Sequence, residues 1–419
     1  FPAFGGFAAQ AITALTAQNT RGVTGIMVTP PEFVAQQIDA VLDDIGADAV
    51  KTGMLGNGDV VKLVAQKLAQ YRPPVVVVDP VMVSKSGHHL LAQDDHRAMI
   101  EDLLPLASVV TPNLDEATVL TGQKVTNLAE MKEAARRIFD LGPQAVLVKG
   151  GHLIGDCLDL LFDGQDFYEF FSARIDTTRT HGTGCTFSAA LATYLAQGEA
   201  LPQAVDAAKK FITLAIKSAP AIGHGFGPTN HCAGLSKELS RMPVLQDLAA
   251  AARRLAEQHL GALVPEVSSN FGYALPAATV AEDVAAFPGR IVRLHGQAVP
   301  VAPPEFGASR HVARIILTLM SADPARRAAM NVAFSEENVA RCRSLGFSVA
   351  EFSRSEEPDD IRIKEGSTLE WGTGQAIKRA GYVPDVIFDR GGWGKEPMIR
   401  ITGRHPDEVA DKVLALAGK

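Results

Sequence analysis

Four short runs of β-branched residues, separated by segments with helical periodicity, constrain the fold of this chain more than any other feature. Each run is too short and too rich in valine for a helix, and each is bounded by glycine, proline or asparagine. Continuous apolar strands that alternate with helices indicate a parallel sheet covered on both faces. The runs are DAVKTGML, PPVVVVDPVM, ASVVTPN and QAVLVKGG, within residues 48–151.

Between and around these runs, apolar residues recur with the period of an amphipathic helix. The segment LDLLFDGQDFYEFFSARI breaks this order, because two strand-like stretches flank Asp163-Gly164, a pattern typical of a β-hairpin. The first half is therefore predicted to be a doubly wound, mostly parallel α/β domain. The apolar helical positions are Val34, Ile38, Val41, Leu42 and Ile45 in one helix, and Leu128, Met131, Ala135 and Ile138 in another.

A second, smaller domain is expected after residue 235, since 419 residues exceed one ordinary domain. The stretch IGHGFGPTNHC at 222–232 lacks apolar periodicity and reads as a linker. An amphipathic helix around residues 245–255 and another around 312–320 follow, with strands at GFSVAEF, DVIFD and EPMIRI. This order fits an α/β or α+β domain spanning 236–419.

Composition excludes several classes of protein. The net charge of -7 offers no basic face for nucleic acid. No apolar run approaches membrane-spanning length and no signal-like start is present, so we expect a cytoplasmic protein. The four cysteines lack CxxC spacing, which argues against a disulfide framework or a structural zinc site.

Polar residues collect where the predicted parallel strands end, which is where such sheets bind ligands. Asp79 and Lys149 end two strands, and Asn113 and Glu116 follow a third. The spacing of Asn113 and Glu116 would let a carboxylate hold Mg²⁺ through water, although a first-turn acid also simply stabilises a helix. Lys149 would take a nucleotide phosphate or, alternatively, a neighbouring carboxylate. Asp79 would organise the metal or the acceptor.

The segment THGTGCTFSAA places a glycine turn before an apolar helix. Gly182, Thr183, Gly184 and Cys185 would present consecutive N–H groups at a helix start, an arrangement suited to phosphate oxygens. A plain helix cap is the alternative. Helix N-termini lower the pKa of a thiol, so Cys185 is predicted to serve as a thiolate base; a small packed cysteine is the other reading.

Six motifs of the first half resemble the hydroxymethylpyrimidine and hydroxymethylpyrimidine-phosphate kinases of thiamine biosynthesis, which are ribokinase-like enzymes. They occur in family order: TALTAQNT, VKTGMLG, VVDPVMVSKSG, TPNLDEA, VLVKGGH and THGTGCT. The second half resembles the thiamine-phosphate synthase domain fused to this kinase in some prokaryotes, through FGASRH, DPARRAAMN, EWG and PDVIFDRGGWGKEPMIRI. The resemblance implies a kinase domain at 1–235 and a synthase domain at 236–419.

For the kinase domain, the resemblance implies ATP as phosphoryl donor, Mg²⁺ as cofactor, and pyrimidine contacts from Gln18, Met54 and Val81. The polar loop Val83–His89 would act as a lid that excludes water. The family normally opens with a strand and a Gly-rich, Asp-containing loop that contacts the pyrimidine. The sequence given begins with Phe and lacks that piece, so we expect an incomplete pyrimidine pocket here.

For the synthase domain, Ser309, Arg310 and His311 stand at an expected helix start and would grip a phosphate. The segment DRGGWGKEP offers Asp389 as a metal ligand and Lys395 for pyrophosphate, with a solvated loop as the alternative. Asn331 and Arg327 are weaker candidates.

The sequence therefore predicts a bifunctional enzyme of small-molecule metabolism. Hydroxymethylpyrimidine would be phosphorylated twice and then coupled to thiazole phosphate, with no nucleic acid or membrane partner; we expect a homo-oligomer, a dimer. Two alternatives remain open. One is a pyridoxal-type kinase, and the other is a kinase fused to a non-catalytic domain that senses thiamine phosphate.

Overall fold

The computed structural model describes residues 3, 5–82, 95–151, 157–358, 367–392 and 394–419. The chain divides into two compact units, Phe1–Leu235 and Ser236–Lys419, and helix α8 (Ala233–Leu239) crosses that boundary. Among the described residues, no helix combines the length and the apolar character needed to cross a membrane.

The first unit is built on a sheet with the strand order β3-β4-β5-β6-β7-β8. Strands β3 to β6 run parallel, and β7 and β8 add an antiparallel hairpin, so the predicted parallel sheet and hairpin are confirmed. The elements of this unit are β1 (Ala14–Asn19), β2 (Gly22–Val28), α1 (Pro31–Leu42), β3 (Ala49–Thr52), α2 (Gly58–Tyr71), β4 (Val75–Val78), α3 (His96–Ala98), β5 (Val109–Val110), α4 (Leu114–Thr121), α5 (Leu128–Phe139), β6 (Val146–Gly150), β7 (Cys157–Phe162), β8 (Phe167–Ser172), α6 (Thr183–Ala196) and α7 (Leu201–Lys217).

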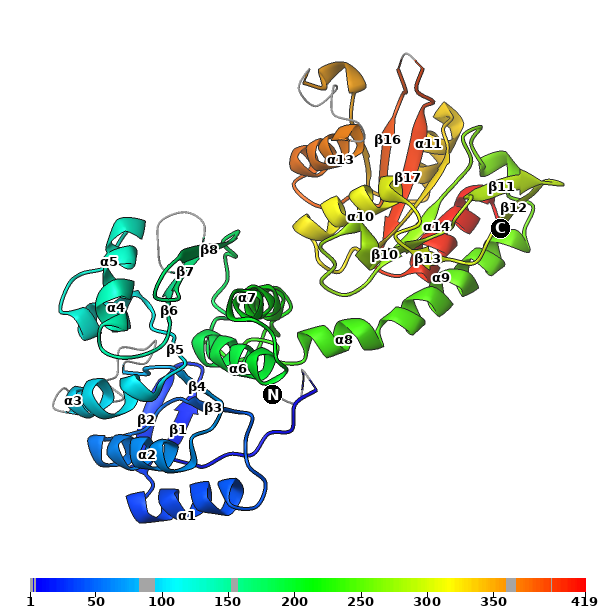
Figure 1. Cartoon of the computed structure of the whole chain (residues 1–419). Helices are drawn as coiled ribbons and strands as arrows, with labels where there is room; N and C mark the ends of the chain where they lie inside the picture. Colours follow the sequence, from blue (N-terminus) through cyan, green and yellow to red (C-terminus); the bar gives the residue numbers. More distant parts are fainter. Residues whose placement is uncertain (1–2, 4, 83–94, 152–156, 359–366, 393) are drawn as a thin grey trace. The chain divides into compact units, whose positions relative to one another are not determined.

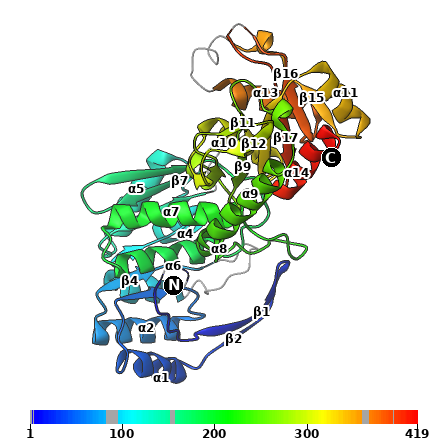
Figure 2. The same cartoon turned by 90° about the vertical axis from the view of Figure 1, so that its right-hand side faces the viewer.

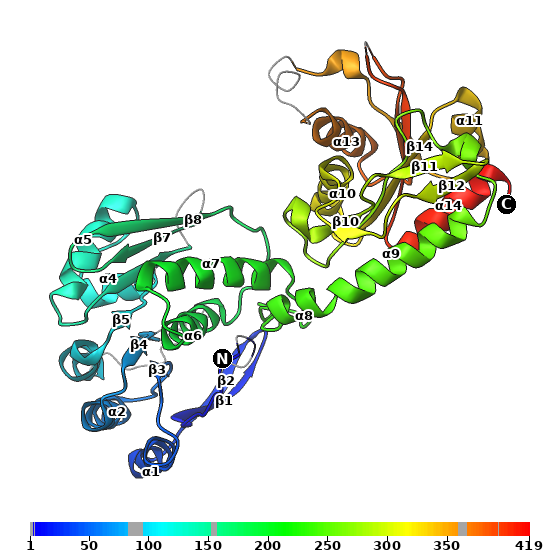
Figure 3. The same ribbon diagram turned by 45° about the vertical axis from the view of Figure 1, so that its right-hand side comes forward.

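Helices cover both faces of this sheet (Figure 3). Successive strand residues point to opposite faces, so Val76 and Val78 pack with α2, α4 and α5, while Val77 packs with α6 and α7. All three valines are almost completely buried. The sheet is therefore doubly wound, as the continuous apolar runs predicted.

Side-chain caps fix the starts of three helices in this unit. Asn57, Asn113 and Asn127 each accept a backbone N–H in the first turn of α2, α4 and α5 respectively. The predicted helix that includes Ile45 is too long, because α1 ends at Leu42 and Ile45 is exposed beyond it. Its apolar period continued by chance past the last helical residue.

Strands β1 and β2 form a separate two-stranded ribbon, seen apart from the main sheet in Figure 2. The Thr20 turn at its tip contacts the segment before α8: the carbonyl of Thr20 accepts the N–H of Phe226 at 2.8 Å. A Cβ atom on Gly225 would lie 2.1 Å from that same carbonyl oxygen, so only glycine allows this approach.

The second unit contains a sheet with the order β13-β10-β9-β14-β17-β16-β15. Figure 1 labels its strands β10, β13, β16 and β17. Its pairs are antiparallel except for β15 and β16, which resolves the α/β-or-α+β alternative toward a mainly antiparallel sheet. The elements are α9 (Arg241–Ala256), β9 (Phe271–Ala274), β10 (Val284–Ala286), β11 (Ile291–Leu294), β12 (Gln297–Pro300), β13 (Glu305–Phe306), α10 (Arg310–Ala322), β14 (Ala328–Ala333), α11 (Glu336–Ser344), β15 (Val349–Glu351), α13 (Ser367–Ala380), β16 (Val386–Asp389), β17 (Met398–Gly403) and α14 (Pro406–Ala417).

Both faces of this second sheet are also covered. Phe388 and Met330 belong to the core that includes α9 and α14, whereas Ile387 and Ala329 pack with α10 and α13. Because both faces are buried, the strands lack the apolar-polar alternation of a half-exposed antiparallel sheet. That loss of alternation is why the sequence left the strand direction open.

A buried ion pair connects α7 to the β7–β8 hairpin in the first unit. Lys209 Nζ on α7 lies 2.7 Å from Asp159 Oδ2 on β7, and both residues are 6% exposed. Asp159 Oδ1 accepts the N–H of Gly150, and Lys209 also donates to the carbonyl of Cys157. The pair thus ties α7 to the hairpin at a position where either charge alone would be costly.

Replacing Lys209 with Met should lower the free energy of unfolding of the first unit by about 3–5 kcal/mol, because it leaves Asp159 charged and unpaired. Adding Asp159→Asn, which keeps the acceptor for Gly150, should recover more than half of the loss. Denaturant titration measures both. Lys210→Met is the matched control, since Lys210 is exposed and pairs with Asp206 on the surface of α7. Similar effects at 209 and 210 would contradict this account.

Candidate active sites

The first candidate site surrounds Asp79, which follows β4 and is 2% exposed. Asp79 Oδ1 lies 2.9 Å from Lys149 Nζ and accepts a hydrogen bond from Thr111. Asp79 Oδ2 accepts from Ser188 Oγ at 3.1 Å and lies 3.7 Å from Lys51 Nζ. The carboxylate therefore binds two ammonium groups from two other strands, and the neighbouring-carboxylate alternative for Lys149 is the one present in this structure.

The glycine turn brings the start of α6 to this cluster. Gly182 precedes α6 with φ of 75°, a left-handed conformation that glycine adopts without strain. A Cβ atom on Gly184 would lie 3.1 Å from Lys149 Nζ, so glycine lets the ammonium approach the helix. First-turn N–H groups have no intrahelical acceptor, while Thr183 Oγ1 donates to the carbonyl of Thr180 and fixes the turn. The arrangement can accept a phosphate group between N–H donors and Lys149.

Sequence reasoning missed Lys51, which lies on β3 beside β4. The charge of Lys51 also acts on the thiol of Cys185. The sequence did contain a sign of its role, because a lysine within an apolar strand needs an acidic partner or an anionic ligand. Ser188 was missed as well, since a serine one turn into an apolar helix resembles ordinary packing.

Cys185 is exposed at the start of α6. Desolvation by the surrounding protein raises the pKa of the Cys185 thiol, although Lys51 and Lys149 oppose this and Asp79 adds to it. The net shift is opposite to the lowering predicted for a thiol at a helix N-terminus, because desolvation disfavours the thiolate. The raised pKa favours the neutral thiol of Cys185 over the thiolate.

Asn113 and Glu116 form a reciprocal cap at the start of α4. Glu116 Oε2 accepts the N–H of Asn113 at 2.8 Å, and Asn113 Oδ1 accepts the N–H of Glu116 at 2.9 Å. Burial, reinforced by Asp79 and opposed by Lys149, raises the pKa of Glu116 to about 7. A buried carboxyl that is driven toward its neutral form becomes charged when a cation binds beside it. Glu116 therefore fits the role of holding a hydrated Mg²⁺ ion.

The three residues predicted to contact a pyrimidine lie in different settings. Gln18 is exposed on β1, where its side-chain oxygen accepts from Thr16. Met54 and Val81 are half-buried and follow the adjacent strands β3 and β4. Their joint role stays a prediction. The predicted lid Val83–His89 lies outside the described residues.

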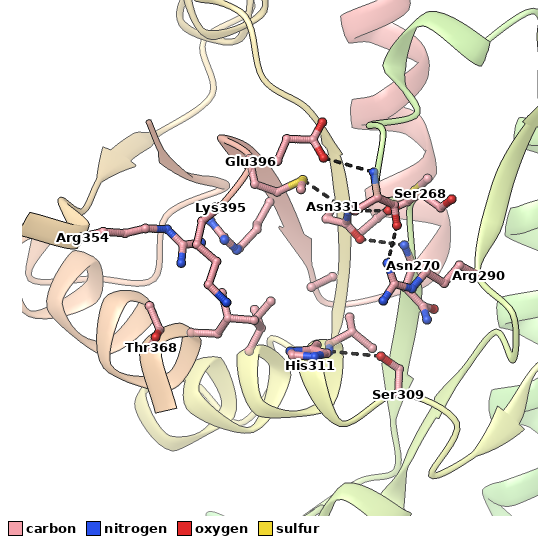
Figure 4. Close-up of a pocket in the computed structure, with 18 of the residues that line it drawn as sticks. Ser268, Asn270, Arg290, Ser309, His311, Asn331, Arg354, Thr368, Lys395 and Glu396 are labelled. Atoms are coloured by element: carbon pink, nitrogen blue, oxygen red, sulfur yellow. Dashed lines mark hydrogen bonds between the residues drawn. The ribbon is translucent and has the colours of Figure 1, made fainter. Parts of the chain in front are cut away.

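The second candidate site is a cavity of about 460 Å³ in the second unit, shown in Figure 4. The residues that line it come from the loop before β9, α10, β14 and the β16–β17 connection, among other segments. Basic side chains dominate its charged lining, with Glu396 as the acidic residue. Both oxygens of Glu396 accept backbone N–H groups, from Glu266 and Val267. The cavity therefore suits a multiply charged anion. Its basic residues are Arg290, Arg354, Lys395, Arg400 and His311.

The start of α10 contributes to this cavity as predicted, but not through Arg310. Ser309 caps the helix by accepting the N–H of Val312, and Ser309 and His311 line the cavity. Arg310 is exposed and is not part of the lining. Successive helical residues point about 100° apart, so Arg310 can face away from the cavity although Ser309 and His311 line it. Arg290, which sequence reasoning missed, lines the cavity from the loop after β10.

Asp389 does not stand free to hold a metal, contrary to its predicted role. Its carboxylate, completely buried, accepts from Arg354 Nε at 2.6 Å, from Arg400 Nη2 at 2.8 Å and from the N–H of Gly391. The Arg400 and Arg354 charges hold the pKa of Asp389 below its usual range despite its burial. The aspartate orients two arginines that line the cavity.

The two weaker candidates, Asn331 and Arg327, form hydrogen bonds to backbone groups of neighbouring segments. Asn331 lines the cavity, but its amide bonds the N–H of Asn270 and the carbonyl of Ser268. Arg327 is outside the lining: it donates twice to the carbonyl of Ala274 and stacks over Tyr273. Lys395 is exposed and lines the cavity, and its contact with pyrophosphate stays a prediction.

Comparisons with known proteins agree with the division into two units. The family model for phosphomethylpyrimidine kinase matches residues 1–230, and that for thiamine-phosphate synthase ThiN matches residues 247–415. The thiamine biosynthesis bifunctional protein ThiED of Geobacter sulfurreducens is 53% identical over 228 residues, which cover 54% of this chain and 46% of that relative. The chain therefore spans about half the length of that bifunctional relative.

A hydroxymethylpyrimidine/phosphomethylpyrimidine kinase of Bacillus subtilis is 45% identical over 229 residues, or 54% of this chain and 84% of the relative. The crystal structure of an ADP complex of Bacillus subtilis pyridoxal kinase matches with a TM-score of 0.52 and 36% identity. That match covers 56% of this chain and 89% of the kinase. The ribokinase-like fold expected for the first unit is thereby confirmed.

The raised pKa of Glu116 predicts a pH-dependent stability. The stability that this group contributes is complete below about pH 4.5 and is lost as the pH rises to about 7, where the folded state must carry a buried charge. Glu116→Gln keeps the cap and cannot ionise. We expect the variant to exceed the wild type by about 1–3 kcal/mol at pH 8, and to match it near pH 5.

Calorimetry of the chain without nucleotide or Mg²⁺ at the two pH values measures this difference. Glu133→Gln is the control, because Glu133 is exposed and pairs with Arg137 on the surface of α5. A difference between wild type and Glu116→Gln that is the same at both pH values would show that burial of the charge is not the cause.

Proposed function

The chain belongs to the phosphomethylpyrimidine kinase family, and we propose that its first unit transfers the γ-phosphoryl group of ATP to hydroxymethylpyrimidine and then to the monophosphate. We propose further that its second unit couples the resulting diphosphate to thiazole phosphate. The products of the coupling are thiamine phosphate and pyrophosphate. The observation that carries the first proposal is the cluster of Lys51, Asp79 and Lys149 at the start of α6.

Phosphoryl transfer is catalysed chiefly by positioning and by stabilising negative charge. The N–H groups at Gly184 and Cys185 and the ammonium of Lys149 would bind the oxygens of the moving phosphoryl group. Mg²⁺, when bound, neutralises charge on the nucleotide phosphates, and Glu116 is the residue that would hold its water shell. Asp79 keeps Lys149 in place between reactions, because it binds the ammonium when no phosphate does.

The neutral thiol of Cys185 fits an enzyme that accepts both an alcohol and a phosphate. A fixed carboxylate at this position would repel an incoming phosphate monoester, whereas a thiol does not. For the alcohol, the hydroxyl proton would leave late in a loose transition state, because little charge develops on the attacking oxygen before the phosphoryl group arrives. The proton would pass to an oxygen of the transferred phosphoryl group and from there to solvent. Cys185 is thus proposed to shape the site and to accept a hydrogen bond from the hydroxyl, rather than to act as a thiolate.

The second unit is proposed to bind two anionic substrates at once in its basic cavity. Joining the pyrimidine diphosphate to the thiazole requires stabilisation of the departing pyrophosphate, which cations supply. Figure 4 shows Arg354 and Lys395 on one side of the cavity, and Arg290 and Ser309 on the other. Two groups of phosphate-binding side chains support a two-substrate reaction over a domain that only senses one ligand.

One experiment tests both halves. The full chain is incubated with hydroxymethylpyrimidine, ATP and Mg²⁺, with and without thiazole phosphate, and products are followed by mass. We expect monophosphate, then diphosphate, and thiamine phosphate only when thiazole phosphate is present. Pyridoxal is supplied as a competing acceptor, because a pyridoxal kinase shares the fold. Preferential phosphorylation of pyridoxal would favour that alternative, and diphosphate that is never coupled would favour a sensor.

Arg290 and Arg310 provide a matched pair for the synthase site. Arg290→Gln should slow thiamine-phosphate formation at least tenfold, since a charge-assisted hydrogen bond to phosphate contributes about 1.5–3 kcal/mol. Arg310→Gln should change it less than twofold, because Arg310 lies outside the lining. Diphosphate formation by the first unit serves as the internal control for both variants. A larger loss at Arg310 would place the phosphate site on another face of α10.

A further inference from the structure

Arg400 stands out in the second unit because one of its donors is buried without a partner. The residue lies on β17 and is 2% exposed. Its Nη2 donates to Asp389, but its Nη1 has no hydrogen-bond partner among the described residues although it is inaccessible to solvent. An unsatisfied buried guanidinium N–H is costly. Since Arg400 lines the cavity, an anionic ligand there would satisfy it.

Arg354 binds the same carboxylate as Arg400, chiefly through the other oxygen of Asp389. Its Nε bonds Asp389 Oδ1 and its Nη2 lies 3.4 Å from Oδ2, so one carboxylate holds both guanidinium groups. The Arg354 side chain is 15% exposed and also lines the cavity. Two arginines on one aspartate leave a net positive charge. The surplus charge faces a cavity in which both Glu396 oxygens already bind backbone N–H groups.

This arrangement differs from the one at the start of α10. There, Ser309 and His311 at the helix start line the cavity together with Arg290, a set of groups suited to a single phosphate. Arg354, Arg400 and Lys395 all line the cavity, and Figure 4 shows Lys395 on the same side as Arg354, so this side offers three cationic groups. A diphosphate carries more charge and more oxygens than a monophosphate, so it gains more from this side of the cavity.

We propose that Arg354 and Arg400, held together by Asp389, form the subsite for the diphosphate group that leaves as pyrophosphate. In the reaction, the bond between the pyrimidine methylene carbon and the diphosphate oxygen breaks, and its electron pair leaves with pyrophosphate. The thiazole nitrogen supplies the pair for the new carbon–nitrogen bond. The arginines bind the charge that develops on the departing oxygen. This inference rests on the synthase activity proposed for the second unit.

The test uses the full chain and inorganic pyrophosphate as the probe. Arg400→Met and Arg354→Gln should each weaken pyrophosphate, measured by calorimetric binding and as a product inhibitor, by about tenfold or more. The KM for thiazole phosphate should change less than threefold. Arg390→Gln is the matched control, because Arg390 adjoins Asp389 in sequence but is exposed and pairs with Glu336 and Glu351. It should leave pyrophosphate binding unchanged.

Two results would overturn the subsite. Pyrophosphate affinity could be unchanged in both variants, or the variants could instead raise the KM for thiazole phosphate, which would assign the arginines to the other substrate. Arg354→Gln keeps the test decisive if Arg400→Met does not fold, since Arg354 is partly exposed. Failure of the proposed function gives a different result. If the wild-type chain binds pyrophosphate through these arginines but forms no thiamine phosphate, the subsite stands and the proposed synthase activity is wrong.

Discussion

The first unit depends on one buried carboxylate that is shared between two lysines. Asp79 lies at the carboxyl end of a central strand, where Lys51 and Lys149 reach it from β3 and β6. An ammonium buried in this position would be costly without a partner, so the aspartate allows the sheet to carry cations where phosphates are expected. The same contact places Lys149 next to the start of α6, where a Cβ atom at position 184 would lie 3.1 Å from the ammonium group. The fold and the candidate site therefore rest on the same ion pairs.

The second unit also has a buried aspartate that binds two cationic side chains, in a different sheet. Asp389 ends β16 and binds Arg354 and Arg400, and both arginines line the basic cavity. One sheet is mostly parallel and the other mainly antiparallel, so the similarity does not come from topology. In both cases a buried aspartate holds two cations in a fixed orientation, which lowers the conformational cost of binding an anion. Arginine suits the second case because its planar fork can serve the carboxylate and a ligand at once.

Sequence reasoning reached the parallel sheet, the hairpin and the polar strand ends, because hydrophobic runs and turn residues are local signals. It failed where the answer depends on distant partners. Asp389 reads as a metal ligand until Arg400, eleven residues later on an antiparallel strand, is seen to occupy it. Arg310 was preferred over Arg290 because a helix start is visible in sequence, whereas the direction of each side chain around the helix is not. Likewise, the pKa of Cys185 is raised by desolvation and by charges from other strands, which the sequence around Cys185 does not reveal.

The valine-only strand β4 has a consequence for how the sheet aligns its strands. Val75 to Val78 present the same side chain to both cores, so sliding the strand by two residues, or even by one, would still bury valine on each face. Hydrophobic patterning alone thus leaves the alignment of β4 with β3 and β5 undetermined. Asp79 removes the ambiguity, because a shift would draw its carboxylate away from both lysines or into the apolar layer. Asp79 therefore has two roles: it holds the lysines of the candidate phosphate site, and it fixes the register of β4 in the sheet.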